Sequence, residues 1–128
     1  MPHLKIEYTA NLEAQGRFEL LCGALASTIA SLADAHGKPV FPLAGTRVLA
    51  YPAPAHAVGD GTPGQGFIYM NLRVTPGRAP DVLDAAGAAL LARVRAHFEA
   101  IALPVPFAVT LHIDEIAPAF EGRYRPQP

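Results

Sequence analysis

Met1-Pro2-His3-Leu4-Lys5-Ile6-Glu7-Tyr8 opens the chain with a regular alternation of polar and apolar residues. A period of two predicts a β-strand over residues 2–8 that buries only one of its faces. The face expected inside carries Leu4, Ile6 and Tyr8, and the opposite face carries His3, Lys5 and Glu7. The other elements can be placed relative to this strand, which begins at Pro2.

Two helices are predicted further along the chain. Apolar residues recur at three- and four-residue spacing between about residues 13 and 36, which predicts a helix with one apolar face. Gly37 suits the left-handed position after a helix, and His36 would lie in the last turn. A second apolar stripe predicts a helix over about 80–102, with Pro80 near its first position.

Three more strands are predicted, over residues 46–51, 67–74 and 107–113. Glycine, proline and small residues fill 52–66, which is therefore expected to be a surface loop. Residues 75–78 form a turn. The order of elements is strand, helix, strand, repeated once, which makes two βαβ units.

Right-handed crossovers make the two strands of each unit parallel. We therefore expect an α+β fold in which two βαβ units form one four-stranded mixed sheet with both helices on one face. The whole chain, 1–128, is expected to be a single domain, and its Pro- and Arg-rich tail, 118–128, to pack on a neighbour or fray. Because no helix covers the other face of the sheet, we predict a homo-oligomer.

Composition excludes several classes of protein. The formal net charge is -1, and the ten Lys and Arg residues form no run or stripe, so no nucleic-acid partner is expected. No apolar segment approaches the roughly 18 residues of a membrane span, and the start lacks a signal-peptide pattern. We expect a cytoplasmic protein without a membrane partner. Cys22 is the single cysteine, so no internal disulfide can form, and it is expected to be a buried small hydrophobe.

Pro2 has a chemical use if Met1 is removed, because its ring nitrogen then becomes a secondary amine. A free α-amino group titrates near roughly 7.7 to 8.0, so about a tenth of it is neutral at pH 7. Lowering its pKa by one unit, through an apolar pocket or nearby cations, would leave roughly half as free base and would cost about 1.4 kcal/mol. Pro2 is therefore a candidate general base.

Further motifs accompany Pro2 at set distances along the chain. They are Met1-Pro2-His3, Phe41-Pro42-Leu43-Ala44-Gly45-Thr46-Arg47, Met70-Asn71-Leu72 running into Gly77-Arg78, His97-Phe98, and Ile113-Asp114-Glu115 with Pro118. Together they resemble the tautomerase superfamily, and in particular the 5-carboxymethyl-2-hydroxymuconate Δ-isomerase family. The resemblance extends to about residue 118. The chain departs from the family pattern at Leu49, where a second arginine is expected.

The resemblance implies a tautomerase fold, like that of macrophage migration inhibitory factor, assembled as a homotrimer. It also implies a cofactor-independent isomerase of aromatic-compound catabolism that acts on a small carboxylate, with no metal. Pro2 would be the general base, with Arg47 and Arg78 as its cationic partners. The remaining implied site residues contact the substrate: His3, Phe41 and Leu43. Arg73 is expected at an interface or in solvent.

These residue types suit the isomerisation of an unsaturated keto dicarboxylate. The reaction moves a proton between carbons through a dienolate, so the protein must supply a base, stabilise an oxyanion and hold carboxylates. The planar guanidinium of arginine binds carboxylate or enolate oxygens through two parallel hydrogen bonds and stays charged. Two such cations beside Pro2 would also depress the pKa of its amine.

The sequence does not indicate a zinc site or a serine hydrolase. The five histidines lack the paired spacing of zinc sites, and no Gly-x-Ser-x-Gly motif indicates a serine hydrolase. Two alternatives stay open. One is keto-enol tautomerisation of a small 2-keto acid, and the other is a non-catalytic trimeric binding protein with the same fold.

Overall fold

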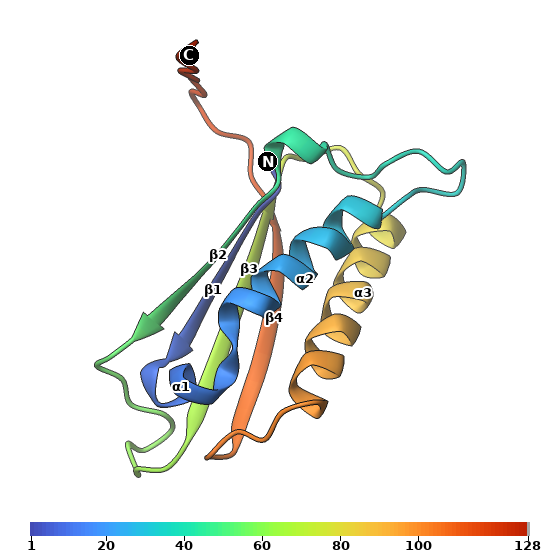
Figure 1. Cartoon of the computed structure of the whole chain (residues 1–128). Helices are drawn as coiled ribbons and strands as arrows, with labels where there is room; N and C mark the ends of the chain where they lie inside the picture. The colour runs from blue at the N-terminus through green and yellow to red at the C-terminus, as the bar shows by residue number, and fades with distance from the viewer. Residues whose placement is uncertain (128) are drawn as a thin grey trace.

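The computed structural model describes residues 1–127; Pro128, at the end of the expected tail, lies outside the described residues. The strands and helices follow one another as two strand–helix–strand units (Figure 1). They are β1 (His3–Thr9), η1 (Ala10–Leu12), α1 (Glu13–Gly16), α2 (Phe18–Ser31), η2 (Leu43–Gly45), β2 (Arg47–Ala53), β3 (Gly66–Val74), α3 (Pro80–Glu99) and β4 (Phe107–Glu115).

The four strands form one sheet in the order β2-β1-β3-β4. β1 is parallel to β2, and β3 is parallel to β4, as the right-handed crossovers require. The two inner strands, β1 and β3, run antiparallel, so the sheet is mixed. Both long helices lie on the same face of the sheet (Figure 1), which confirms the predicted fold class.

The core lies between this face of the sheet and the two helices. β1 contributes Leu4 and Ile6, which are completely buried, and β3 buries every second side chain. Against them pack the apolar stripes of the helices, Leu21, Leu25 and Ile29 of α2 and Ala86, Leu90 and Val94 of α3. Burying one large aliphatic side chain contributes about 1.5–3 kcal/mol, so the alternation read from the sequence accounts for the sheet's position against the helices.

The first predicted helix is broken and is shorter than expected. Arg17, between α1 and α2, has a left-handed backbone with φ of 50°. A Cβ atom at Gly16 would collide with the ring of Phe18, so the break needs glycine at that position. The carbonyl of Gly16 accepts a hydrogen bond of 2.8 Å from Nε2 of the buried His97, which joins the break to α3.

The same helix ends at Ser31, so the prediction that His36 lies in its last turn is wrong. The carboxylate of Asp34 accepts hydrogen bonds from the backbone N–H groups of His36 at 2.8 Å and Lys38 at 3.0 Å. Asp side chains compete in this way with helical hydrogen bonds and favour turns.

Within residues 1–127, no helix combines the length and apolar character needed to cross a membrane.

Candidate active site

Pro2 lies at the start of an inner strand, next to the first residue of β2. The backbone N–H of Arg47 donates a 3.0 Å hydrogen bond to the carbonyl of Pro2. The ring of Pro2 is fully buried, and its nitrogen is joined to Met1 as a peptide nitrogen. The strand pairing therefore fixes the position of the Pro2 nitrogen relative to β2.

Two arginines flank His3 on the face of the sheet that no helix covers. His3 is paired with Arg47 on β2 and with Arg73 on β3, so all three side chains belong to one row across the sheet. Within residues 1–127, Nε of Arg73 is buried and has no hydrogen-bond partner. The row thus brings a partly desolvated guanidinium close to the start of β1.

The pKa of His3 is lowered from its ordinary value. Burial is the largest cause, followed by the positive charges of the N-terminal amine, Arg47, Arg73 and Arg123. The effect of these four cations on one imidazole indicates a positive potential at the start of β1.

A hollow of about 520 Å³ lies at this end of the molecule. It is lined by Met1, His3, Pro42, Ala44, Gly45, Arg47, Glu121, Gly122, Arg123 and Arg125. Gly45 allows the chain start to approach η2 closely, because a Cβ atom there would lie 3.0 Å from the nitrogen and the oxygen of Met1. Nη1 of Arg47 donates to the carbonyls of Ala44 and Thr46, each at 2.9 Å, which holds its guanidinium beside the hollow.

Arg78 and Phe41 form a separate contact. Nε of Arg78 donates to the carbonyl of Val40 at 3.1 Å, and Nη1 donates to the carbonyl of Thr75 at 3.0 Å. The guanidinium carbon lies 4.4 Å from the centre of the Phe41 ring. Phe41 is only 3% exposed, so in this structure it packs beneath Arg78 and offers no surface to a substrate.

Of the six predicted site residues, Arg47 and His3 line the hollow, and Pro2 lies between Met1 and His3, which both line it. Leu43 lies in η2 next to the hollow and is 75% exposed. Arg78 and Phe41 are not among the described residues that line the hollow.

Sequence reasoning missed the tail residues of the hollow and gave Arg73 another role. Strand alternation places Arg73 on the uncovered face, but only the β1–β3 register places it opposite His3. Arg123 follows β4 by eight residues, and no local pattern in the sequence indicates where an extended tail runs. The arginines of the tail, Arg123 and Arg125, were the one feature of the sequence that could have indicated a role in binding an anion.

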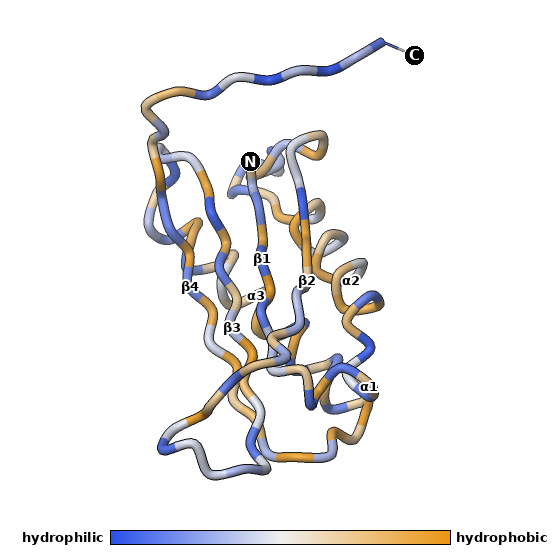
Figure 2. The backbone as a smooth tube through the Cα atoms, turned by 90° about the vertical axis from the view of Figure 1, so that its left-hand side faces the viewer, coloured by the Kyte–Doolittle hydropathy of each residue, from blue (hydrophilic) through white to orange (hydrophobic). Residues whose placement is uncertain are grey.

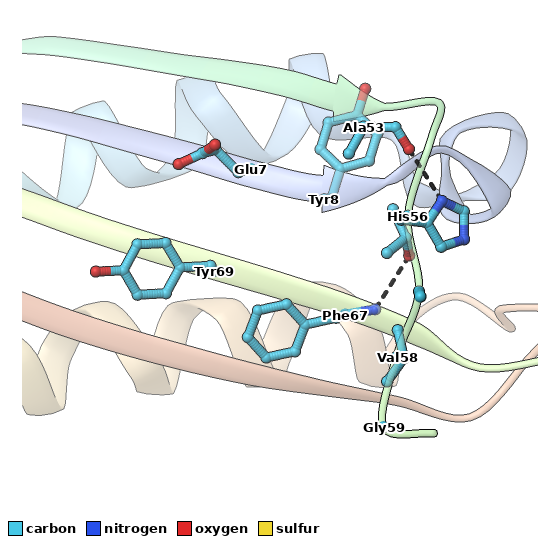
Figure 3. Close-up of a pocket in the computed structure, with 10 residues that line it drawn as sticks. Glu7, Tyr8, Ala53, His56, Val58, Gly59, Phe67 and Tyr69 are labelled. Carbon is cyan, nitrogen blue, oxygen red and sulfur yellow. Dashed lines mark hydrogen bonds between the residues drawn. The ribbon is translucent and has the colours of Figure 1, made fainter. Parts of the chain in front are cut away.

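A second hollow, of about 550 Å³, lies at the other end of the uncovered face (Figure 3). The loop at 54–65 forms one wall, and the polar residues of the lining are Glu7, Tyr8, Thr9, His56 and Tyr69. Its lining begins on β1 at Glu7, five residues from Pro2, which corresponds to about 17 Å along the strand. It has no arginine among its lining residues within 1–127, so it lacks the cations that the expected chemistry needs.

Across the part of the chain that the structure describes, no three His, Cys, Asp or Glu side chains gather closely enough to hold a metal ion.

Two βαβ units in one mixed four-stranded sheet define the class of α+β fold that solved 5-carboxymethyl-2-hydroxymuconate isomerases share with this chain. The sequence pattern of one family in this class, 5-carboxymethyl-2-hydroxymuconate isomerase, matches residues 2–125. The chain belongs to this family and is an isomerase.

Three relatives show the extent of the similarity. The 5-carboxymethyl-2-hydroxymuconate Delta-isomerase of Escherichia coli is 25% identical over 118 residues, which cover 92% of this chain and 89% of the relative. A crystal structure of a 5-carboxymethyl-2-hydroxymuconate delta-isomerase superposes with a TM-score of 0.90 and 34% identity, over 98% of this chain and 89% of that chain. A 5-carboxymethyl-2-hydroxymuconate isomerase from Deinococcus radiodurans R1 gives a TM-score of 0.80 and 28% identity, over 98% and 90%.

Proposed function

We propose that the chain, after removal of Met1, isomerises an unsaturated keto acid with two or more carboxylates, such as 5-carboxymethyl-2-hydroxymuconate, with the amine of Pro2 as general base. The observation that carries this proposal is the position of Met1, which lines the hollow beside Gly45 and Arg47. Removing Met1 would leave the Pro2 nitrogen as an amine at the wall of that hollow, with cations around it.

The proposed reaction moves one proton and leaves the composition of the substrate unchanged. The neutral amine of Pro2 takes a proton from a carbon next to the carbonyl group, and the electron pair of the broken C–H bond passes into a dienolate. The protonated amine then returns the proton to a different carbon, which restores the carbonyl group and the neutral amine. A positioned base of this kind contributes about 10² to 10⁴ in rate.

Arg47 is proposed to stabilise the dienolate oxygen or to bind a substrate carboxylate. Its guanidinium is held beside the hollow by the carbonyls of Ala44 and Thr46, so little rearrangement is needed when an anion arrives. The positive charges that lower the pKa of His3 would also oppose protonation of an amine at Pro2. Substrate binding and activation of the base would then depend on the same cations.

The other predicted residues receive different proposed roles. His3 would contact the substrate from the floor of the hollow, and Leu43 would contact it from the exposed side of η2. Arg78 remains a proposed cationic partner. Two of its nitrogen atoms bind backbone carbonyls, and its guanidinium lies on Phe41, so these contacts would hold it and the loop before η2 in a fixed geometry.

A homotrimer is part of the proposal. The face of the sheet opposite the helices exposes apolar groups, including Leu49 and Tyr51 of β2. A solved fused 4-OT protein that shares this fold, at 18% identity and a TM-score of 0.63, forms a symmetric trimer. Burial of the uncovered face between three copies would remove this apolar surface from water.

Two assays test the proposed function. Absorbance assays on a panel of 2-hydroxymuconates and enol pyruvates should show turnover of the diacids, whereas turnover of small enol pyruvates alone would favour the keto-enol tautomerase. A 3-halopropiolate or an α-halo-ketone should alkylate the Pro2 nitrogen, as located by peptide mass spectrometry. A Met1-free protein that is not alkylated at Pro2 would contradict both enzymatic functions.

A further inference from the structure

The C-terminal tail crosses the end of the molecule where the chain begins. The backbone N–H of Ile116, just after β4, donates a 2.9 Å hydrogen bond to the carbonyl of Val74, which anchors the start of the tail to the sheet. From there the tail passes above the N-terminus toward the β2 side (Figure 2). Its residues Glu121, Gly122, Arg123 and Arg125 line the hollow of the candidate active site.

The tail adds positive charge to that hollow. Among the described residues that line it, there are three arginines and one carboxylate, that of Glu121. Oε1 of Glu121 accepts hydrogen bonds from Nε of Arg123 at 3.1 Å and from Nη2 at 2.7 Å. This contact restrains the direction of the Arg123 guanidinium. Because one carboxylate faces three arginines among these described residues, positive charge is left over to attract an anion.

A separate observation places the charge of Arg123 near the start of β1. Arg123 is among the cations that lower the pKa of His3, together with Arg47 and Arg73 of the adjoining strands. Two groups of cations therefore surround the start of the chain. One belongs to the sheet, with Arg47 paired to His3, and the other belongs to the tail; Arg47, Arg123 and Arg125 all line the hollow.

We propose that Arg123 and Arg125 bind the substrate carboxylate that lies away from the reacting carbon, and so select dicarboxylates over monocarboxylates. This inference rests on the proposed function of the same site. A hollow of about 520 Å³ is within the usual range for small-molecule sites, about 300–1,000 Å³. A diacid carries two separate carboxylates, and Arg47 of the sheet and the two arginines of the tail would supply cations to both.

The consequence is a selective loss of binding when the tail arginines are removed. A carboxylate remote from the reacting carbon keeps its charge throughout the reaction, so its contacts are equally strong in the ground and transition states. Loss of such uniform binding raises KM and leaves kcat nearly unchanged. For the double variant Arg123→Ala/Arg125→Ala we expect KM for a diacid to rise about tenfold, the lower end for hydrogen bonds to charged groups.

The kinetic experiment compares two substrates and four proteins. KM and kcat are measured for a 2-hydroxymuconate and for a monocarboxylic enol pyruvate, with the parent protein, the double variant, Arg123→Lys/Arg125→Lys, and the control Arg93→Ala on the exposed side of α3. KM should rise only for the diacid, most in the alanine variant and less in the lysine variant, and should not change in Arg93→Ala. Equal KM values in parent and alanine variant, or equal rises for both substrates, would overturn the proposal.

A binding experiment separates this proposal from the catalytic one. Adipate, a saturated six-carbon diacid that cannot react, is titrated while the His3 imidazole resonances are followed by NMR. The double alanine variant should bind adipate about tenfold more weakly than the parent; equal binding would overturn the role of the tail, whether or not Pro2 reacts. Alkylation of Pro2 by an α-halo-ketone is measured on the parent protein alone. A parent that is not alkylated would contradict Pro2 as the base, and the adipate comparison would still decide the role of the tail.

Discussion

At the scale of single residues, the proposed isomerisation depends on the ring nitrogen of Pro2 as the base. Replacing Pro2 by Ala leaves a primary amine in place of the secondary amine and removes the ring that fixes its direction. Because a positioned base contributes about 10² to 10⁴ in rate, we expect kcat to fall about tenfold or more without complete loss of activity. Steady-state kinetics of the Met1-free variant provide the measurement, and an undiminished kcat would show that another group is the base.

Arg47 is the second residue on which the site depends. Arg47→Ala removes a guanidinium that backbone carbonyls hold at the hollow, so we expect kcat to fall and KM to rise, with kcat/KM lower by at least about tenfold. Arg93→Ala, on the exposed side of α3, is the matched control for loss of one positive charge. Similar kcat/KM values for the two variants would remove Arg47 from the mechanism.

At the scale of elements, Tyr8 joins the end of β1 to the first helical turns. Its hydroxyl donates to the Glu13 carboxylate at 3.2 Å, and its ring stacks on Phe18 at 3.6 Å between centroids. Burial, followed by the charge of Glu13, raises the pKa of Tyr8 to about 12. The unfolded chain would lose this proton near pH 10, so the free energy of unfolding should fall as the pH rises from 10 to 12.

Urea unfolding at several alkaline pH values measures this effect. The parent should lose up to about 2 kcal/mol between pH 10 and 12, since each pKa unit corresponds to about 1.4 kcal/mol. Tyr8→Phe should lack this part of the pH dependence because it carries no titrating group. Identical slopes for the two proteins would mean that Tyr8 titrates normally in the fold.

The elements also show what the sequence could predict. Strand alternation and helical spacing depend on burial against a common core, so all four strands, α3 and the shared helix face followed from them. The break at Arg17 did not, because it depends on a close contact of Gly16 with Phe18 and on the bond from His97, which is 81 residues away. Helical spacing continued to Leu32, but the Asp34 carboxylate favoured a turn soon afterwards.

At the scale of the whole molecule, the uncovered face of the sheet predicts association. Light scattering should give about three times the monomer mass of 13.5 kDa. Tyr51, 48% exposed on that face, would become buried in the assembly, so Tyr51→Asp should shift the population toward monomers. The control is Leu20→Asp, because Leu20 is 60% exposed on α2, outside the sheet. A monomeric parent, or dissociation by the control alone, would contradict this arrangement.

The candidate site could be predicted from the sequence only in part, because some of its residues come together only in the complete fold. Pro2 and Arg47 lie in motifs, and the pairing of β1 with β2 brings them together. Arg73 and the tail arginines meet the start of the chain only through the β1–β3 register and the path of the tail, which arise from the complete fold.

The proposal that Pro2 is a general base activated by nearby cations is tested by titrating its nitrogen in Met1-free protein, followed by ¹⁵N NMR. We expect the pKa of this amine to lie below the ordinary range of roughly 7.7 to 8.0, because the positive charges that act on the neighbouring His3 would also act on it. An amine that titrates within or above that range would contradict the proposal that cations activate Pro2 as the base.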